Sequence, residues 1–287
     1  MPETKSNFLL IFQNSWWVSF TIFLTVFLIT FFFIYQLIPF SFANAPISIF
    51  FASFLANSSV VLIQNFRVWH FAGLMVNRYS IKHFTFGFLL PLILFLPVLL
   101  VLYFKGISLQ KVSYLDLLFY LYYIGFNATS EELLFRGVLF QKLIDKKGEI
   151  FAVFISSIVF AIAHIWNPNL TILALLNIFL AGVLLAICYI KTSLLWLPIG
   201  FHFGWNFWQK LVLDSPVSGL RWGTPLVQTK ITELNEIVFG GTFGIEGGLV
   251  TTILLLFAII FVSKSFVPCP EVISKILKER YQSRNLS

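Results

Sequence analysis

The stretch that decides the fold is SEELLFRG, residues 130–137, which places three formal charges inside an otherwise apolar run over residues 115–144. A charge at the centre of a bilayer costs roughly 2.5 to 3.5 kcal/mol on insertion scales, so such groups are paired, hydrated or functional. Glu132 and Arg136 are four residues apart and share a helical face, which predicts a structural ion pair. Glu131 is rotated by about 100° from that face and is free to face another group.

The composition of the chain is that of a polytopic membrane protein. Of its 287 residues, 59% are hydrophobic, 11% are charged and 36 are Phe, and the mean hydropathy is +0.90. Ordinary soluble domains are about 25% charged, so a soluble domain of this length is excluded. We expect an all-α bundle of about eight transmembrane helices in a lipid bilayer, with residues 1–287 forming a single membrane domain.

Eight apolar runs supply these helices. The first is far longer than the core of a signal peptide, so cleavage is not expected. The segment 67–83 is expected to lie along the membrane surface, and the polar, glycine-containing connection 213–248 is not expected to span. The approximate bounds of the runs are 16–40, 47–63, 84–104, 115–144, 149–166, 170–190, 194–212 and 249–262.

The chain has 19 Lys and Arg but only 12 Asp and Glu, and membrane topology explains this excess of positive charge better than a nucleic-acid site does. With a cytoplasmic N-terminus and eight spans, thirteen Lys and Arg residues fall in inner segments and five in outer segments. The positive-inside rule then predicts that both termini are cytoplasmic. We expect a multi-pass plasma-membrane protein without a nucleic-acid partner.

Two other runs carry ionisable side chains deep within them. The fifth contains FAIAH, which ends at His164, and the seventh contains HFGWN, from His202 to Asn206. A lone histidine on an apolar helix is usually a packing residue. A rise of 1.5 Å per residue from the predicted cytoplasmic helix ends, however, places Glu131, His164, His202 and Asn206 at depths of about 16 to 22 Å. This is one layer of a roughly 30 Å hydrocarbon core, which favours a shared site.

The chemistry that this layer could perform is hydrolysis of an amide within the membrane. Glu131 would take a proton from water while His164 holds and polarises the same water. His202 and Asn206 could donate hydrogen bonds to the oxyanion of a tetrahedral intermediate. Glu131, His164 and His202 could alternatively bind zinc with one open position. The residues favour water activation without metal or other cofactor, and both alternatives stay open.

The patterns EExxxR at 131–136, FxxxH at 160–164 and HxxxN at 202–206 resemble, in this order, the three motifs of the CPBP family. This family, also called Abi, comprises CAAX prenyl endopeptidases and bacteriocin-processing or immunity proteins. The resemblance is strong over residues 115–206, the expected catalytic core. The glycine-rich segment 240–248 is similar to one that precedes the last helix of the family.

The resemblance implies an intramembrane endopeptidase that acts on a membrane-associated peptide or protein, in CAAX-type or bacteriocin-related processing. It implies that Glu131 and His164 activate water and that His202 and Asn206 form the oxyanion hole. Members have been described both as metalloendopeptidases and as metal-independent glutamate proteases. Two other functions remain: a proton-coupled transporter that uses the buried Glu and His as a relay, and a non-catalytic immunity or binding membrane protein. The first is disfavoured, because the polar residues show no inverted symmetry.

Overall fold

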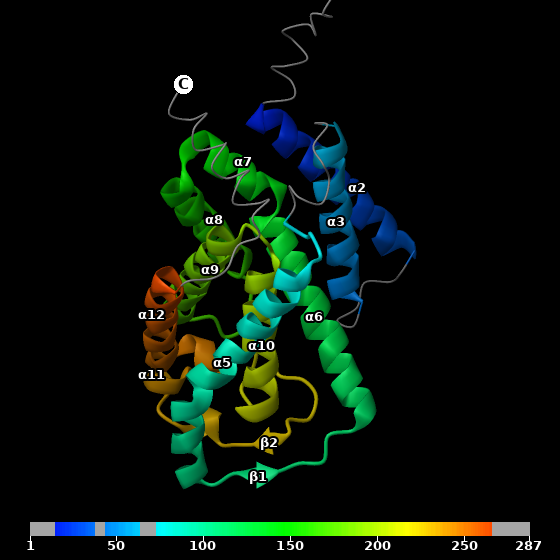
Figure 1. Ribbon diagram of the computed structural model, residues 1–287. Coiled ribbons are helices and arrows are strands. Elements are labelled where there is room, and N and C mark those ends of the chain that lie inside the picture. The colour runs from blue at the N-terminus through cyan, green and yellow to red at the C-terminus, as the bar shows by residue number, and fades with distance from the viewer. Residues whose placement is uncertain (1–14, 38–43, 64–72, 266–287) are drawn as a thin grey trace, which may run out of the picture.

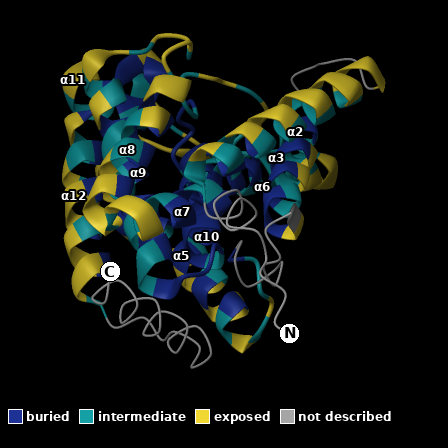
Figure 2. Cartoon of the chain, turned by 90° about the horizontal axis from the view of Figure 1, so that it is seen from above, coloured by how far each residue is buried: buried dark blue, intermediate teal, exposed yellow. Residues whose placement is uncertain are grey.

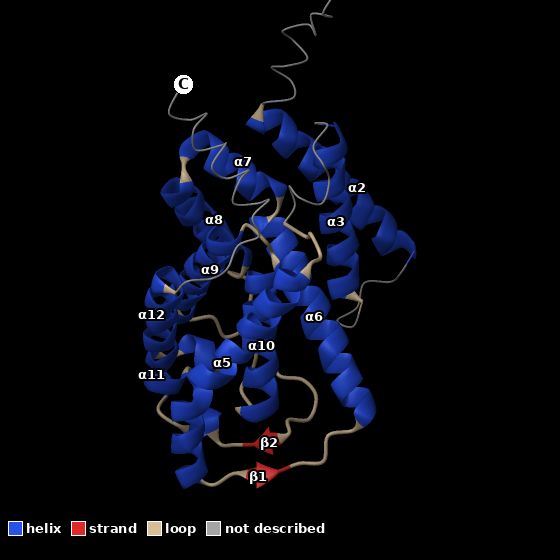
Figure 3. Cartoon of the chain, in the orientation of Figure 1, coloured by secondary structure: helices blue, strands red, loops and turns tan. Residues whose placement is uncertain are grey.

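The computed structural model describes residues 15–37, 44–63 and 73–265. Within these ranges most of the chain is helical (Figure 3). The one sheet in the described part pairs two short antiparallel strands, β1 (Ser108–Leu109) and β2 (Val227–Gln228). The all-α bundle predicted from the sequence is therefore confirmed.

Within the described residues, seven of the eight predicted apolar runs each correspond to one helix, and the fourth corresponds to two. Four of these helices, α2, α3, α5 and α9, are long and apolar enough to cross a bilayer, and α8 and α12 are apolar but shorter. The helices are α2 (Trp16–Leu37), α3 (Ala45–Ile63), α5 (Arg78–Lys105), α6 (Tyr114–Arg136), α7 (Val138–Lys147), α8 (Glu149–Ala163), α9 (Ile172–Thr192), α10 (Trp196–Val212) and α12 (Leu249–Lys264).

Helix α5 begins six residues before the predicted third run. Asn77 caps its first turn by accepting hydrogen bonds from the backbone N–H groups of Tyr79 and Ser80. Ser80 in turn accepts from the N–H of Asn77, which completes a capping box. Residues 78–83, predicted to lie on the membrane surface, therefore belong to α5. Residues 67–72 of that segment lie outside the described ranges.

The fourth predicted run is two helices rather than one, because α6 and α7 are separated at Gly137. The side chain of Asn57 on α3 fills the break. Its Oδ1 accepts a hydrogen bond from the N–H of Val138 at 2.8 Å, and its Nδ2 donates to the Leu133 carbonyl at 3.0 Å. A Cβ at position 137 would collide with this side chain. The continuous helix assumed for the depth estimate is wrong, because a polar group of a neighbouring helix interrupts the ladder.

Helix α10 lies at the centre of the bundle, where fourteen of its seventeen residues are buried (Figure 2). A Cβ on Gly200 or Gly204 would collide with backbone carbonyls of α5, so the two helices pack at close range. Positions two apart on a helix point in nearly opposite directions. This packing therefore turns His202 and Asn206 away from α5 and towards α6 and the end of α8.

We expect Gly204→Ala to lower the stability of the bundle by about 1 to 3 kcal/mol, because the added methyl overpacks the contact with α5. Gly125→Ala on α6 is the matched control. A Cβ at position 125 meets nothing within 4 Å, and Ala is preferred to Gly inside a helix. Thermal unfolding in detergent measures both. Equal melting temperatures for the two variants would contradict the close packing of α5 and α10.

The connection between α10 and α12 is folded against the bundle. It contains β2 and several short elements and returns along α9 and α12 (Figure 1). Although it does not span, it brings part of its chain to the centre of the molecule. The short elements are η1 (Ile231–Glu233), α11 (Glu236–Phe239), η2 (Gly241–Phe243) and η3 (Ile245–Gly247).

The outer surface of the bundle suits lipid. Exposed Leu, Ile and Phe residues lie along α2, α5 and α12, and exposed positions of α2 and α12 are coloured yellow in Figure 2. A continuous apolar surface of this kind is solvated by acyl chains, and the protein is an integral membrane protein. The C-terminal ends of α7 and α5 lie at opposite ends of the bundle (Figure 1). The last turn of α7 carries Lys146 and Lys147, and that of α5 carries Lys105. Which end is cytoplasmic stays a prediction.

Candidate active site

Helix α6 carries two neighbouring carboxylates that face different partners. Glu132 is fully buried, and its Oε1 accepts a hydrogen bond from Arg136 Nη1 at 3.1 Å. Arg136 also donates to the Gly182 carbonyl of α9 at 3.1 Å. Its guanidinium lies 4.4 Å from the centroid of the Phe160 ring on α8. Arg136 thus links α6 to α8 and α9 beside Glu131.

Glu132 has a second partner that the helical spacing did not reveal. Nδ1 of His202 on α10 lies 2.9 Å from the same Oε1 atom. An ionised carboxylate only accepts hydrogen bonds, so Nδ1 of His202 carries a proton. This contact turns Nε2 of the ring towards Glu131. Glu132 therefore positions a candidate catalytic residue as well as its own helix.

The carboxylate of Glu131 faces both histidines. Its Oε2 lies 3.7 Å from Nε2 of His202 and 3.8 Å from Nε2 of His164. Direct hydrogen bonds span about 2.7 to 3.2 Å, so these gaps suit a bridging water. Oε2 is buried without a hydrogen-bond partner among the described residues. The other oxygen, Oε1, accepts from Nδ2 of Asn127 at 2.8 Å, which fixes the orientation of the carboxylate.

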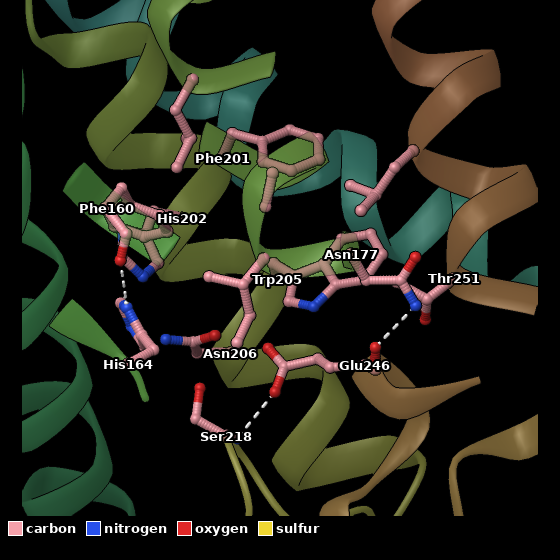
Figure 4. Close-up of a pocket in the computed structure, with 14 residues that line it drawn as sticks. Phe160, His164, Asn177, Phe201, His202, Trp205, Asn206, Ser218, Glu246 and Thr251 are labelled. Carbon is pink, nitrogen blue, oxygen red and sulfur yellow. Dashed lines mark hydrogen bonds between the residues drawn. The ribbon is translucent and has the colours of Figure 1, made fainter. Parts of the chain in front are cut away.

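His164 caps α8 instead of lying inside it. The helix ends at Ala163, although the fifth run was predicted to reach residue 166, and the N–H of His164 turns back to the carbonyls of the preceding turn. Nδ1 of its ring lies 2.7 Å from the Phe160 carbonyl (Figure 4). A carbonyl only accepts, so this Nδ1 is the donor and Nε2 of the neutral ring carries a lone pair. That lone pair faces Glu131.

Two cavities meet at these side chains. The larger has a volume of about 190 Å³ and reaches Glu131 and Asn127. The smaller has a volume of about 50 Å³ and is walled mainly by apolar residues of α9, α10 and α12 (Figure 4). The larger cavity has room for several water molecules. Four residues line both cavities: His164, His202, Asn206 and Ser218.

Asn206 lies one turn after His202 on α10 and is buried. No other described residue hydrogen-bonds to its side-chain amide. The residue lines both cavities, so its amide can donate a hydrogen bond to a ligand bound there. The structure thus brings all four predicted site residues together at the junction of the two cavities.

Some residues of the site were not found from the sequence. Asn127 precedes Glu131 by one turn, and this spacing could have revealed it. Ser218 and Glu246 belong to the connection between α10 and α12, for which the sequence analysis predicted no role in the site. The signal for Glu246 was a lone carboxylate inside the glycine-rich segment 240–248.

In the described part of the chain, no group of three or more His, Cys, Asp or Glu side chains is arranged to hold a metal ion. Glu131, His164 and His202 form the candidate set that the sequence suggests. Zinc binding by these three residues and metal-free activation of water both stay predictions, which metal analysis of the purified protein separates.

Residues 113–208 match the model of a family described as type II CAAX prenyl endopeptidase Rce1-like. The matched segment is about a third of the chain and contains all four candidate catalytic residues. The chain is also 27% identical over 113 residues to a Bacillus subtilis (strain 168) protein named "Putative membrane peptidase YdiL". That match spans 39% of this chain and 41% of the relative. The family resemblance indicated by the motifs is confirmed, and it supports a CAAX-type membrane peptidase at the level of the family.

Proposed function

We propose, from a core that matches the Rce1-like family over residues 113–208, that this protein is an intramembrane endopeptidase in which Glu131 and His164 activate water. The observation that carries the proposal is the buried Oε2 of Glu131, which has no hydrogen-bond partner among the residues that the structure describes and faces two imidazole nitrogens at 3.7 and 3.8 Å. Oε2 of Glu131 and Nε2 of a neutral His164 are both acceptors. A water molecule placed between them supplies the missing donors.

The row of charges across the site supports one assignment of protons. Arg136, Glu132, His202 and Glu131 follow one another with separations of 3.1, 2.9 and 3.7 Å. The row is neutral when His202 carries a proton on both ring nitrogens. Neutrality is favoured because an unpaired charge is costly in a low-dielectric interior. A doubly protonated His202 donates to Glu132 through Nδ1 and offers a second N–H at Nε2.

Hydrolysis then proceeds in two steps. Glu131 takes a proton from the water, aided by His164, and the water oxygen attacks the carbonyl carbon of the scissile amide. The resulting oxyanion accepts hydrogen bonds from Nε2–H of His202 and from the amide of Asn206. Glu131 next gives its proton to the amide nitrogen, and the C–N bond breaks. The products are a carboxylic acid and an amine, which accounts for the atoms of the water consumed.

The substrate we propose is a membrane-associated peptide, because the site lies within an apolar bundle. The test uses purified protein in liposomes with two peptides of one CAAX sequence, one farnesylated on its cysteine and one not. Cleavage of either, detected by mass spectrometry, supports the peptidase, and cleavage of the farnesylated peptide alone supports CAAX-type processing. Cleavage of neither contradicts the CAAX-type proposal. Metal analysis of the same preparation separates water activation from zinc catalysis.

Asn206→Asp is expected to lower kcat by about 10²- to 10³-fold with little change in KM, because a carboxylate in place of the amide repels the oxyanion. The substitution is nearly isosteric, so the fold should be retained. Rates on whichever peptide the wild type cleaves give the result. A wild-type kcat for this variant would remove Asn206 from the proposed oxyanion hole.

A further inference from the structure

A tight turn from the connection between α10 and α12 enters the site. Val217 and Leu220 pair through two backbone hydrogen bonds of 3.0 and 2.9 Å. The two residues between them, Ser218 and Gly219, both have positive φ angles, of 51° and 83°. This is the geometry of a two-residue type I′ turn, whose tip here reaches both cavities.

Hydrogen bonds from the segment before α12 hold the turn in place. The N–H of Gly219 donates to the Phe243 carbonyl at 2.9 Å. The N–H of Ser218 donates to Oε2 of Glu246 at 2.6 Å (Figure 4). The backbone carbonyl of Glu246 in turn accepts from Nδ2 of Asn177 on α9 at 2.7 Å. These contacts fix the tip of the turn relative to the bundle.

Serine is an unfavourable residue at this tip. The left-handed region suits Gly, Asn and Asp, and other residues adopt it at a cost in conformational energy. Residues held in this way gather at functional sites, where the surroundings compensate for the strain. What Ser218 adds over glycine is its hydroxyl, for which the described residues provide no hydrogen-bond partner.

The hydroxyl lies where a substrate would bind. Ser218 lines both cavities together with His164 and Asn206. Figure 4 shows its side chain pointing towards the Asn206 amide, on the side of the His164 ring. The amide of Asn206 and the hydroxyl of Ser218 are two donors without a partner in the described part of the chain, and they face one space, as the groups that bind an oxyanion must.

We propose that Ser218 is a further catalytic residue, which donates a hydrogen bond from its hydroxyl to the oxyanion beside Asn206, and that Glu246 is its positioning residue. This inference rests on the proposed endopeptidase function. Ser218 acts as a donor and forms no covalent bond to the substrate. Glu246 acts through the backbone N–H of Ser218, which it holds so that the hydroxyl faces the site.

The test compares Ser218→Gly and Ser218→Ala on whichever peptide the wild type cleaves. Both variants lose the hydroxyl, so both should lose about 100-fold in kcat with KM little changed. Their stabilities should differ, because glycine adopts the positive φ angle freely and alanine does not. A melting temperature of Ser218→Gly at or above that of the wild type is therefore expected together with the loss of rate.

Glu246 is tested by a pair of variants. Glu246→Gln keeps an oxygen that can accept from the N–H of Ser218 and should retain most of the rate, whereas Glu246→Ala should lose kcat as Ser218→Gly does. Combining Glu246→Ala with Ser218→Gly should lower kcat no further than either change alone, because both changes remove the same hydrogen bond, from the Ser218 hydroxyl to the oxyanion. If Glu246 had a purely structural role, the loss of kcat in the double variant would instead be the product of the losses in the two single variants.

The outcomes separate this inference from the proposed function. An inactive Glu131→Gln with a wild-type kcat for Ser218→Gly overturns the role of Ser218 alone. Wild-type cleavage by Glu131→Gln overturns the proposed function. If the wild type cleaves neither peptide, the melting temperatures decide: a Ser218→Gly protein less stable than the wild type means that the hydroxyl serves the fold, and the inference is wrong.

Discussion

Glu131→Gln is expected to lower kcat by about 10²- to 10⁴-fold, the range typical of a lost general base. Glutamine has the shape of glutamate and can still accept the hydrogen bond from Asn127, which measures 2.8 Å. It cannot take a proton from water. The variant should therefore fold, bind substrate with a similar KM and fail in the chemical step. Steady-state kinetics on the cleaved peptide and thermal unfolding in detergent measure the two parts of this expectation.

The matched control is Glu233→Gln, which makes the same chemical change on the surface. The side chain of Glu233 is 66% exposed, and it pairs with Lys230 at 3.4 Å. Exposed ion pairs contribute about 0 to 1 kcal/mol, so this variant should keep the wild-type rate and stability. Wild-type kinetics for Glu131→Gln would remove this carboxylate from the reaction, and with it the proposed function.

The sequence was informative where the physical signal is local. Lipid makes a charge in an apolar run conspicuous, so Glu131, Glu132 and Arg136 stood out from the 115–144 run without any tertiary information. Spacing of four residues then sorted side chains onto faces of one helix. For the same reason His202 and Asn206 could be placed on one face of α10, and the helical bundle followed from the lengths of the apolar runs.

Features that depend on distant parts of the chain were missed. The break at Gly137 is made by Asn57, eighty residues earlier, and nothing in the local sequence of α6 predicts it. The contact of Glu132 with His202 joins residues 70 positions apart. The turn at Ser218 was predicted only to be part of a polar connection, because the role proposed for it depends on a contact with Glu246, 28 residues later. Local spacing cannot supply such contacts.

Arg136→Met is expected to lower stability by about 3 to 5 kcal/mol, the cost typical of removing one partner of a buried ion pair. Both side chains of the pair are fully buried, so the carboxylate of Glu132 would keep its charge with His202 as its remaining ionic partner. Methionine fills a similar volume, which limits the cavity left between α6, α8 and α9. Unfolding by denaturant in detergent measures the loss.

A double substitution shows whether charge or packing is responsible. Glu132→Gln combined with Arg136→Met removes both charges and should recover part of the lost stability, because no uncompensated carboxylate is left inside the bundle. Arg78→Met is the surface control, since Arg78 is exposed and stacks on the neighbouring Tyr79 ring at 5.0 Å. If Arg136→Met is as stable as Arg78→Met, the buried pair does not hold α6 against α8 and α9. The geometry around Glu131 would then depend on its other contacts, such as the hydrogen bond from Asn127 and the packing of α10 against α5.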